Sequence, residues 1–251
     1  MSSNESAQSR ESRPRYLEAM GIQSWEQRGS TASVSKTEGA PETQTPAGQP
    51  VEVPDTVAPD TGTGALDWDA LQARVAECTL CDLHQGRTRT VFGTGNRSAD
   101  WMVIGEAPGH DEDLQGEPFV GRAGQLLNAM LQAIGLDREQ VYIANIVKCR
   151  PPGNRDPLPG EVSRCEPYLT RQIRLVQPAV ILAVGRIAAQ NLLQTETAIG
   201  KLRGRVHQFR DTGIPLLATY HPAYLLRSPL EKRKVWQDLQ LADRVAKGEI
   251  G

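Results

Sequence analysis

The sequence predicts an α/β fold, a three-layer α/β/α domain with a central four-stranded, mainly parallel sheet, preceded by a disordered N-terminal tail. Three observations lead to this fold class. Four short apolar runs alternate with stretches of helical periodicity, the pattern of strands joined by crossover helices. The alternation is confined to residues 65–251. Residues 29–64 contain no aromatic residue, Leu, Ile or Met, so they cannot bury enough apolar surface to offset the entropy lost on folding.

Each element follows from its own local pattern. A short first helix is predicted because Asp67 can cap it and because Leu71 and Val75 share one face. Four buried strands are predicted from apolar runs at residues 101–104, 141–147, 179–184 and 216–219. Further helices are predicted at residues 126–134, 160–176, 185–193 and 228–246. Gly135 ends the first of these helices, and Pro178 stops the second.

The net charge of -2 is the sum of two unequal parts. Residues 1–64 carry five Lys or Arg and nine Asp or Glu, a net charge of -4. Residues 65–251 hold the remaining 23 basic and 21 acidic residues, a net charge of +2. This excess of positive charge is too small to demonstrate nucleic-acid binding by itself. We expect a tail at residues 1–28, a linker at 29–64 and one monomeric folded domain at 65–251.

Targeting signals are not evident in the sequence. No apolar run approaches the ~18 residues of a membrane helix, and residues 1–15 lack the hydrophobic region of a signal peptide. We therefore expect a cytoplasmic protein that does not bind membranes. In that compartment the four cysteines are more typical of metal ligands or free thiols than of disulfides.

Three polar side chains of different chemistry come at the ends of predicted strands. Glu106 follows the first strand, Asn145 lies near the end of the second, and His221 follows the fourth. Ligands of open α/β sheets bind beyond the carboxyl ends of the strands, so this edge is the expected site. Taken alone, a histidine there is often structural and an asparagine often forms a turn. A carboxylate, a carboxamide and an imidazole together favour a functional site.

The sequence resembles the family 4 (iron–sulfur) uracil-DNA glycosylases of bacteria and archaea. The matching motifs are Gly105-Glu106-Ala107-Pro108-Gly109, Glu117-Pro118-Phe119-Val120-Gly121-Arg122-Ala123-Gly124, Asn145-Ile146-Val147-Lys148-Cys149-Arg150-Pro151-Pro152 and His221-Pro222-Ala223-Tyr224-Leu225-Leu226-Arg227. They occur in the family's order and cover residues 70–247. The resemblance implies an enzyme that flips uracil out of DNA, hydrolyses its N-glycosidic bond and leaves an abasic site for base excision repair.

The resemblance implies roles for three side chains. Phe119 would stack on the flipped uracil, and the alternative is an ordinary core residue. Asn145 would donate to uracil O4 and accept from N3–H, a pattern that cytosine reverses. His221 would donate a hydrogen bond to O2 of the departing uracil anion. The sequence does not determine whether this imidazole is neutral or charged.

Glu106 has two possible roles. Family 1 enzymes carry a water-positioning Asp at the next position, which is Ala107 here. Glu106 would then either activate water or shape the pocket against the methyl group of thymine. Gly109 stands where family 1 has a Tyr that excludes this methyl group. Gly105, Ala107 and Gly109 are expected to contact the substrate.

The segment after His221 is expected to approach DNA. Leu225 or Leu226 would wedge into the space that the flipped base vacates, with Arg227 near a phosphate. Arg122 would also contact the DNA backbone. The alternative for these arginines is ordinary solvated surface.

The four cysteines form a compact pair, Cys78 and Cys81, followed far downstream by Cys149 and Cys165. Four thiolates hold either a zinc ion or a [4Fe–4S] cluster, and spacing alone does not choose. The family resemblance implies a [4Fe–4S] cluster of structural role, with zinc as the alternative. It would join the first helix to the loop after the Asn145 strand.

The tail contains a short apolar segment, residues 15–25, that ends in Trp25. It is similar to the N-terminal peptide of the psi subunit of bacterial DNA polymerase III. This similarity implies a tether to the clamp loader or another replisome component. The alternative is a segment that folds back on the domain.

Two other functions share this fold. A non-catalytic DNA or replisome adaptor would not need the complete set of Glu106, Phe119, Asn145 and His221. A covalent uracil-DNA binder would carry a basic insert with a histidine after the Asn145 strand, whereas residues 149–155 contain no histidine.

Overall fold

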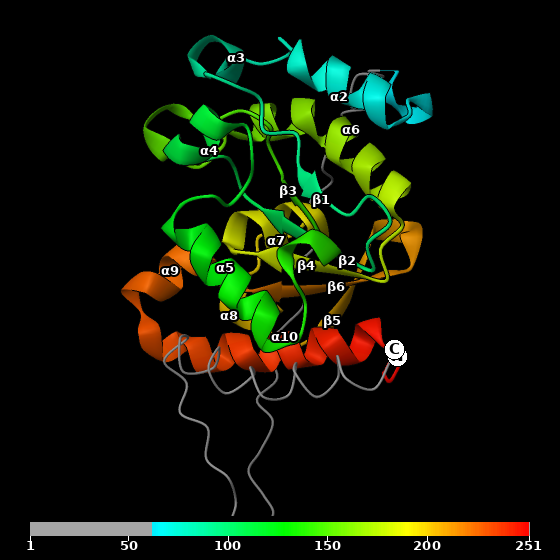
Figure 1. The fold of residues 1–251 in the computed structure, drawn as a ribbon, viewed down its shortest axis with the longest axis vertical. Helices are drawn as coiled ribbons and strands as arrows, with labels where there is room; N and C mark the ends of the chain where they lie inside the picture. The colour runs from blue at the N-terminus through cyan, green and yellow to red at the C-terminus, as the bar shows by residue number, and fades with distance from the viewer. Residues whose placement is uncertain (1–61, 251) are drawn as a thin grey trace, which may run out of the picture.

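The computed structural model describes residues 62–250 (Figure 1). The predicted tail, its segment 15–25 and residues 29–61 of the predicted linker lie outside the described residues. The first described residues already pack against the domain: Thr63 is buried, and the 3-10 turn η1 (Thr63–Ala65) contacts helix α6 (Pro159–Val176). No helix among the described residues has both the length and the apolar character that crossing a bilayer requires.

Residues 62–250 form a sheet of six strands, and the α/β fold class is confirmed. In spatial order the strands are β1 (Thr94–Gly95), β3 (Tyr142–Asn145), β2 (Trp101–Gly105), β4 (Val180–Val184), β6 (Ile214–Thr219) and β5 (Val206–Phe209). The central four are parallel and correspond to the four predicted strands. The predicted number of four is wrong because β1 and β5 add an antiparallel strand at each edge.

Both edge strands lack the signal that identified the central ones. Strand β1 has only two residues, and β5 is exposed or half-buried along most of its length. A short or polar edge strand is held mainly by backbone pairing, which leaves no apolar run in the sequence.

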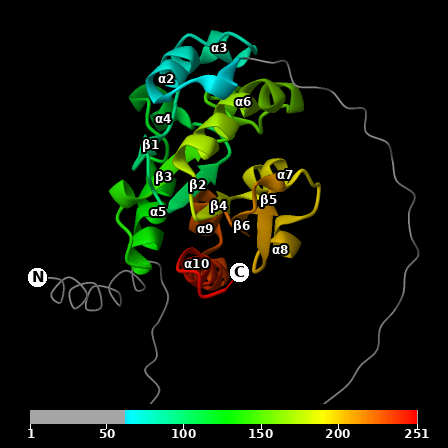
Figure 2. The same ribbon diagram turned by 90° about the vertical axis from the view of Figure 1, so that its right-hand side faces the viewer.

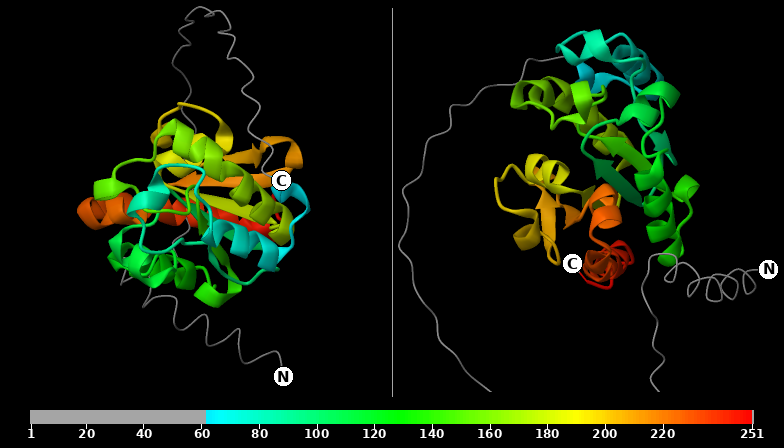
Figure 3. Two further views of the ribbon diagram at one scale, coloured as in Figure 1. Left: turned by 90° about the horizontal axis from the view of Figure 1, so that it is seen from above. Right: turned by 90° about the vertical axis from the view of Figure 1, so that its left-hand side faces the viewer.

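Helices cover both faces of the sheet (Figures 2 and 3). The helices are α2 (Trp68–Ala76), α3 (Leu83–Gly86), α4 (His110–Gln115), α5 (Arg122–Ala133), α6, α7 (Arg186–Leu193), α8 (Ile199–Leu202), α9 (Pro222–Arg227) and α10 (Lys232–Ala246). Side chains of α2, α6 and α7 pack with Met102 and Ile104 on one face. Side chains of α5, α9 and α10 pack with Trp101 and Val103 on the other. Alternate residues of β2 thus enter opposite cores, which gives three layers.

The ends of the predicted helices differ from the structure in one important place. Asp67 caps α2 as expected, with its Oδ1 accepting from the Ala70 N–H at 2.9 Å. The predicted last helix at 228–246 begins only at Lys232. The separate helix α9 and the 3-10 turn η5 (Pro229–Glu231) precede it. Helix α9 packs against α5, so it is oriented by a contact that periodicity does not reveal.

Parallel pairing aligns the carboxyl ends of the central strands. Gly105 pairs with Asn145, and Val184 pairs with Thr219. Strand β2 lies between β3 and β4. The chain therefore leaves β2 toward β3 on one side and later returns to β4 on the other side, which leaves a crevice beyond the carboxyl end of β2. That is where open α/β sheets bind their ligands.

Candidate active site and cysteine recess

A recess of about 400 Å³ opens at the carboxyl edge of the sheet. It brings together the predicted Glu106, Asn145, His221 and Phe119 from four separate segments. Its other lining residues are Ala107, Pro108, Gly109, Glu112, Ala123, Pro151, Asn154, Arg155, Ala223 and Arg227. The three chemically different groups that the strand ends predicted therefore share one recess.

Asn145 ends β3 and is 2% exposed. Within residues 62–250 its buried Oδ1 atom has no hydrogen-bond partner. Burying an acceptor without a donor costs about 1–3 kcal/mol, so native proteins seldom leave one. The carboxamide lines the recess, and its free acceptor is positioned for a donor on a ligand.

Gly105 leaves room for Asn145 and Phe119 to approach the end of β2. A Cβ atom at Gly105 would lie 2.5 Å from Asn145 Oδ1 and 2.6 Å from Phe119 Cζ. Both distances are shorter than any ordinary contact, so a larger residue would displace one or both side chains. Gly105 thus shapes the site although it is not part of the recess wall.

Phe119 is 7% exposed and belongs both to the core and to the recess. Its ring centroid lies 5.6 Å from that of His221, with 30° between the planes. Its φ angle is 55°, a left-handed conformation that a bulky residue adopts only when its surroundings impose it. Arg138 donates to the backbone oxygens of Phe119 and Pro118, which holds the loop in this conformation.

Glu112 is a functional candidate that sequence reasoning missed. Its carboxylate lines the recess and accepts from the N–H groups of Gly109 at 3.1 Å, Val120 at 3.1 Å and Gly121 at 3.3 Å. It therefore joins the turn after β2 to the loop that carries Phe119. The signal was the spacing from Gly109 to Glu112, in which an acid at the third helical position bonds back to the cap residue.

His221 is the cap residue of α9, and its Nδ1 accepts from the Ala223 N–H at 3.2 Å. With Nδ1 acting as an acceptor, the proton of the neutral ring lies on Nε2. Burial, together with the charge of Arg227, lowers the pKa of His221 to about 4, although the charge of Glu112 opposes the shift. His221 is therefore a neutral donor through Nε2 at neutral pH.

Glu106 follows β2 directly, and burial raises its pKa to about 7. The charge of Asp156 adds to the rise, while Arg186 opposes it. Asp156 and Arg186 pair with each other at 2.5 Å between Oδ2 and Nη2. Near pH 7 the Glu106 carboxyl is thus poised between its acid and its base form.

The residues expected at DNA occupy different environments. Leu225 is fully buried in the core with α5 and α10, so its proposed role as a wedge is wrong. Leu226 is 39% exposed and Arg227 lines the recess. Arg122 is exposed at the start of α5 and is outside the recess lining.

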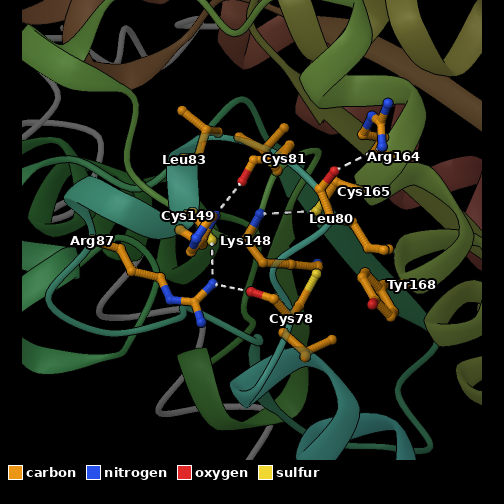
Figure 4. A pocket seen from close by; sticks show the side chains of 13 residues that line it. Cys78, Leu80, Cys81, Leu83, Arg87, Lys148, Cys149, Arg164, Cys165 and Tyr168 are labelled. Atoms are coloured by element: carbon orange, nitrogen blue, oxygen red, sulfur yellow. Dashed lines mark hydrogen bonds between the residues drawn. The ribbon is translucent and has the colours of Figure 1, made fainter.

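All four cysteines line a second, narrow recess (Figure 4). Cys78 and Cys81 lie between α2 and α3, Cys149 follows β3, and Cys165 is on α6. None of them forms a disulfide in the described chain. Arg87 donates to Cys149 Sγ at 3.3 Å, and the Lys148 N–H donates to Cys165 Sγ at 3.3 Å. Among the described residues, no group of three His, Cys, Asp or Glu side chains is close enough to hold a metal ion.

Comparison with known proteins identifies the family. The pattern of the Uracil DNA glycosylase superfamily matches residues 92–240. A type-4 uracil-DNA glycosylase of Archaeoglobus fulgidus is 47% identical over 178 residues, 68% of this chain and 89% of the relative. One from Thermotoga maritima is 41% identical over 184 residues, 72% of this chain and 95% of the relative. A type-5 uracil-DNA glycosylase of Pyrobaculum aerophilum is 31% identical over 152 residues, 55% of this chain and 67% of the relative.

The type-4 relatives align along most of their own length and at higher identity than the type-5 protein. The matched region contains the whole of the recess that holds Glu106, Asn145 and His221. The chain therefore belongs to the uracil-DNA glycosylase superfamily, as a member of its type-4 family.

Proposed function

We propose that this protein is a uracil-DNA glycosylase of base excision repair. It binds a uracil that has left the DNA stack, hydrolyses the bond between uracil N1 and deoxyribose C1′, and leaves an abasic site. The single observation that carries the assignment is the unpartnered Oδ1 of Asn145, buried in a recess with His221 and Phe119. The type-4 relatives support it independently.

Asn145 reads the base. Its Oδ1 accepts from N3–H of uracil, and its amide group donates to O4. Cytosine presents an unprotonated N3 and an amino group at these positions. The carboxamide oxygen of Asn145 would then face another acceptor, N3, and its NH2 group would face another donor, the amino group. A site built around a hydrogen bond rejects a base that cannot form it. The ring of Phe119 stacks on the bound uracil and contributes roughly 1–3 kcal/mol.

His221 stabilises the leaving group. When the N1–C1′ bond breaks, both bonding electrons go to uracil, and negative charge grows on O2. The Nε2–H of His221 donates to that oxygen, as in an oxyanion hole, and one such donor contributes about 3–4 kcal/mol. The acceptor role of Nδ1 keeps the proton on Nε2.

Glu106 acts as the general base that activates the attacking water. The water oxygen bonds to C1′, and its proton passes to the Glu106 carboxylate. A general base works best with a pKa near the working pH, which fits the pKa of about 7 that burial gives Glu106. The alternative role of Glu106, shaping the pocket against the methyl group of thymine, would not require its carboxyl to ionise.

DNA is held by a few residues at the rim of the recess. Leu226 is the candidate to fill the gap in the duplex, because it is partly exposed and lies on α9 between the recess residues Ala223 and Arg227. Arg227 and Arg122 are the candidates for phosphate contacts. Ala107 and Gly109 complete the wall of the substrate pocket, and Gly105 leaves room in it for the side chains of Asn145 and Phe119.

The four cysteines would hold a [4Fe–4S] cluster. The donor set is suitable, because the thiols of all four cysteines line one recess, and four cysteine thiolates are the usual ligands of such a cluster. Bound there, the cluster would crosslink α2, α6 and the segment after β3. Anaerobic purification with iron, sulfide and zinc analysis tests this. Four irons per chain with the brown absorbance support the cluster, and stoichiometric zinc without iron contradicts it.

Activity is tested with an oligonucleotide that contains one uracil, followed by alkaline cleavage. The wild-type protein is expected to release uracil and to leave the matching thymine strand intact. His221→Ala and Asn145→Ala should each lower the rate roughly 100-fold or more, as expected for lost transition-state hydrogen bonds. An intact uracil strand after treatment with cluster-loaded wild-type protein would favour the adaptor alternative.

Residues 15–25 are proposed to tether the enzyme to the clamp loader or another part of the replisome. The sequence alone supports this, through the apolar residues that end in Trp25. A pull-down of clamp-loader subunits by the full chain should lose its signal with Trp25→Ala. Equal recovery with this variant would end the proposal.

A further inference from the structure

Lys148 is a buried cation that the proposed mechanism does not use. It is 1% exposed and lies immediately before Cys149, in the segment after β3. Its side chain turns back along the chain, and Nζ donates to the backbone oxygen of Asn145 at 2.9 Å. Lys148 therefore touches the residue that reads uracil, although it is not part of the lining of the substrate recess.

The same side chain lines the cysteine recess (Figure 4). Its backbone N–H donates to Cys165 Sγ at 3.3 Å, and the thiols of Cys165 and Cys149 are its electrostatic neighbours. No ion pair links Lys148 to a carboxylate within residues 62–250.

A buried ammonium group is unfavourable unless opposite charge compensates it. Among the described residues, the anionic groups that could compensate Lys148 at short range are the thiolates of Cys149 and Cys165, which become negative when they bind a metal group. An apolar side chain of similar length would fill the same space without this electrostatic requirement. The presence of lysine thus indicates a function for its charge and its N–H donors.

We propose that Lys148 is a positioning residue that connects the cysteine site to Asn145. Its ammonium group balances the negative charge of the loaded cysteine site, and its hydrogen bond fixes the end of β3 so that the Asn145 carboxamide meets the flipped uracil. The reader, the cation and one cysteine then occupy five consecutive residues, 145–149. This inference rests on the proposed function and on the proposed cluster.

The test compares Lys148→Met with Lys148→Arg in the full-length, anaerobically purified protein. Methionine keeps most of the volume but removes the charge and the donor, whereas arginine keeps both. Lys201→Met makes the same chemical change at an exposed position on α8 and serves as the control. Each protein is assayed for iron content, for single-turnover excision of uracil, for KM on the DNA and for the midpoint potential of the cluster.

At full iron content, Lys148→Met is expected to lower kcat roughly tenfold and to change KM for the DNA little, because the loss concerns alignment rather than DNA affinity. Its midpoint potential should fall, because a neighbouring positive charge favours the reduced cluster. Lys148→Arg should recover most of kcat and of the potential, and Lys201→Met should match the wild type in every measurement.

Wild-type kcat and potential in an iron-loaded Lys148→Met protein would overturn the proposal. If Lys148→Met purifies without iron, Lys148→Arg decides: retained iron and activity support the role of the charge, and loss of both overturns it in favour of simple packing. A wild-type protein without activity on uracil refutes the proposed function instead, and a wild type without iron refutes the proposed cluster.

Discussion

Substitution of Gly105 by alanine should inactivate the site while it leaves the fold intact. Gly105 ends β2 and lies against Asn145 and Phe119, the two side chains that are proposed to bind the base. An added Cβ would lie 2.5 Å from Asn145 Oδ1 and 2.6 Å from Phe119 Cζ, where ordinary contact begins at 3.4 Å. Asn145 would have to withdraw by about 0.9 Å and Phe119 by about 0.8 Å, unless the strand itself moves.

The expected loss follows from these displacements. A misplacement of about 1 Å in a reacting complex costs roughly 100-fold in rate, and here both the reading group and the stacking ring move. Overpacking of this kind usually destabilises a protein by about 1–3 kcal/mol, too little to unfold a typical domain. We therefore expect a loss of roughly 100-fold in kcat with only a modest fall in stability.

The assay is single-turnover excision of uracil from an oligonucleotide, with urea unfolding of the same preparation. Gly160→Ala is the matched control, because a Cβ at Gly160 on α6 meets no atom within 4 Å. It should leave the rate unchanged. A Gly105→Ala protein that is folded and excises uracil within about threefold of the wild-type rate would refute the steric argument.

Three further predictions concern residues around the same recess. Because the pKa of Glu106 is about 7, kcat should rise with pH through about 7 as the carboxylate forms. The Glu106→Gln variant should not show this rise. A flat wild-type profile between about pH 5.5 and 8.5 would contradict the role of Glu106 as a base. His221, with a pKa of about 4, should contribute no inflection in that range. Glu112→Gln should lower the free energy of unfolding by about 1.5–3 kcal/mol and slow excision. The reason is that an amide cannot accept from all three N–H groups that donate to the carboxylate. An unchanged urea unfolding curve would contradict this role of Glu112. Leu226→Ala should slow excision more on duplex than on single-stranded DNA, without loss of stability. Leu225→Ala should instead lower the free energy of unfolding by about 2–5 kcal/mol, because Leu225 is buried in the core. If the Leu226 variant is slowed equally on both substrates, Leu226 is not a wedge.

The sequence was sufficient to predict the central architecture. The four parallel strands are buried on both faces, so each leaves a continuous apolar run such as residues 180–184. The edge strand Val206–Phe209 leaves none, because most of it is exposed or half-buried. The separate helix α9 was also missed, since it is too short to establish a period and is held by its packing on α5.

The candidate site divides in a similar way. Glu106, Asn145 and His221 were predictable because parallel strands end at one edge of the sheet, whatever their distance along the chain. The contact of Glu112 with Val120 and that of Lys148 with Asn145 both use backbone groups, which any residue could supply. The spacing of Gly109 and Glu112 therefore predicts a helix cap, but no pairing of residue types reveals these two contacts.

By itself, the sequence determined the fold class, the strands that end at the site and the chemical groups available there, because periodicity and side-chain type are properties of short segments. Only the tertiary structure decided which of two adjacent leucines is exposed, that His221 is neutral with its proton on Nε2, and that Asn145 keeps a free acceptor. These properties depend on burial and on hydrogen bonds fixed by packing. Burial of Leu225 arises from its contact with α5 and α10, and the low pKa of His221 arises from the loss of water around its ring.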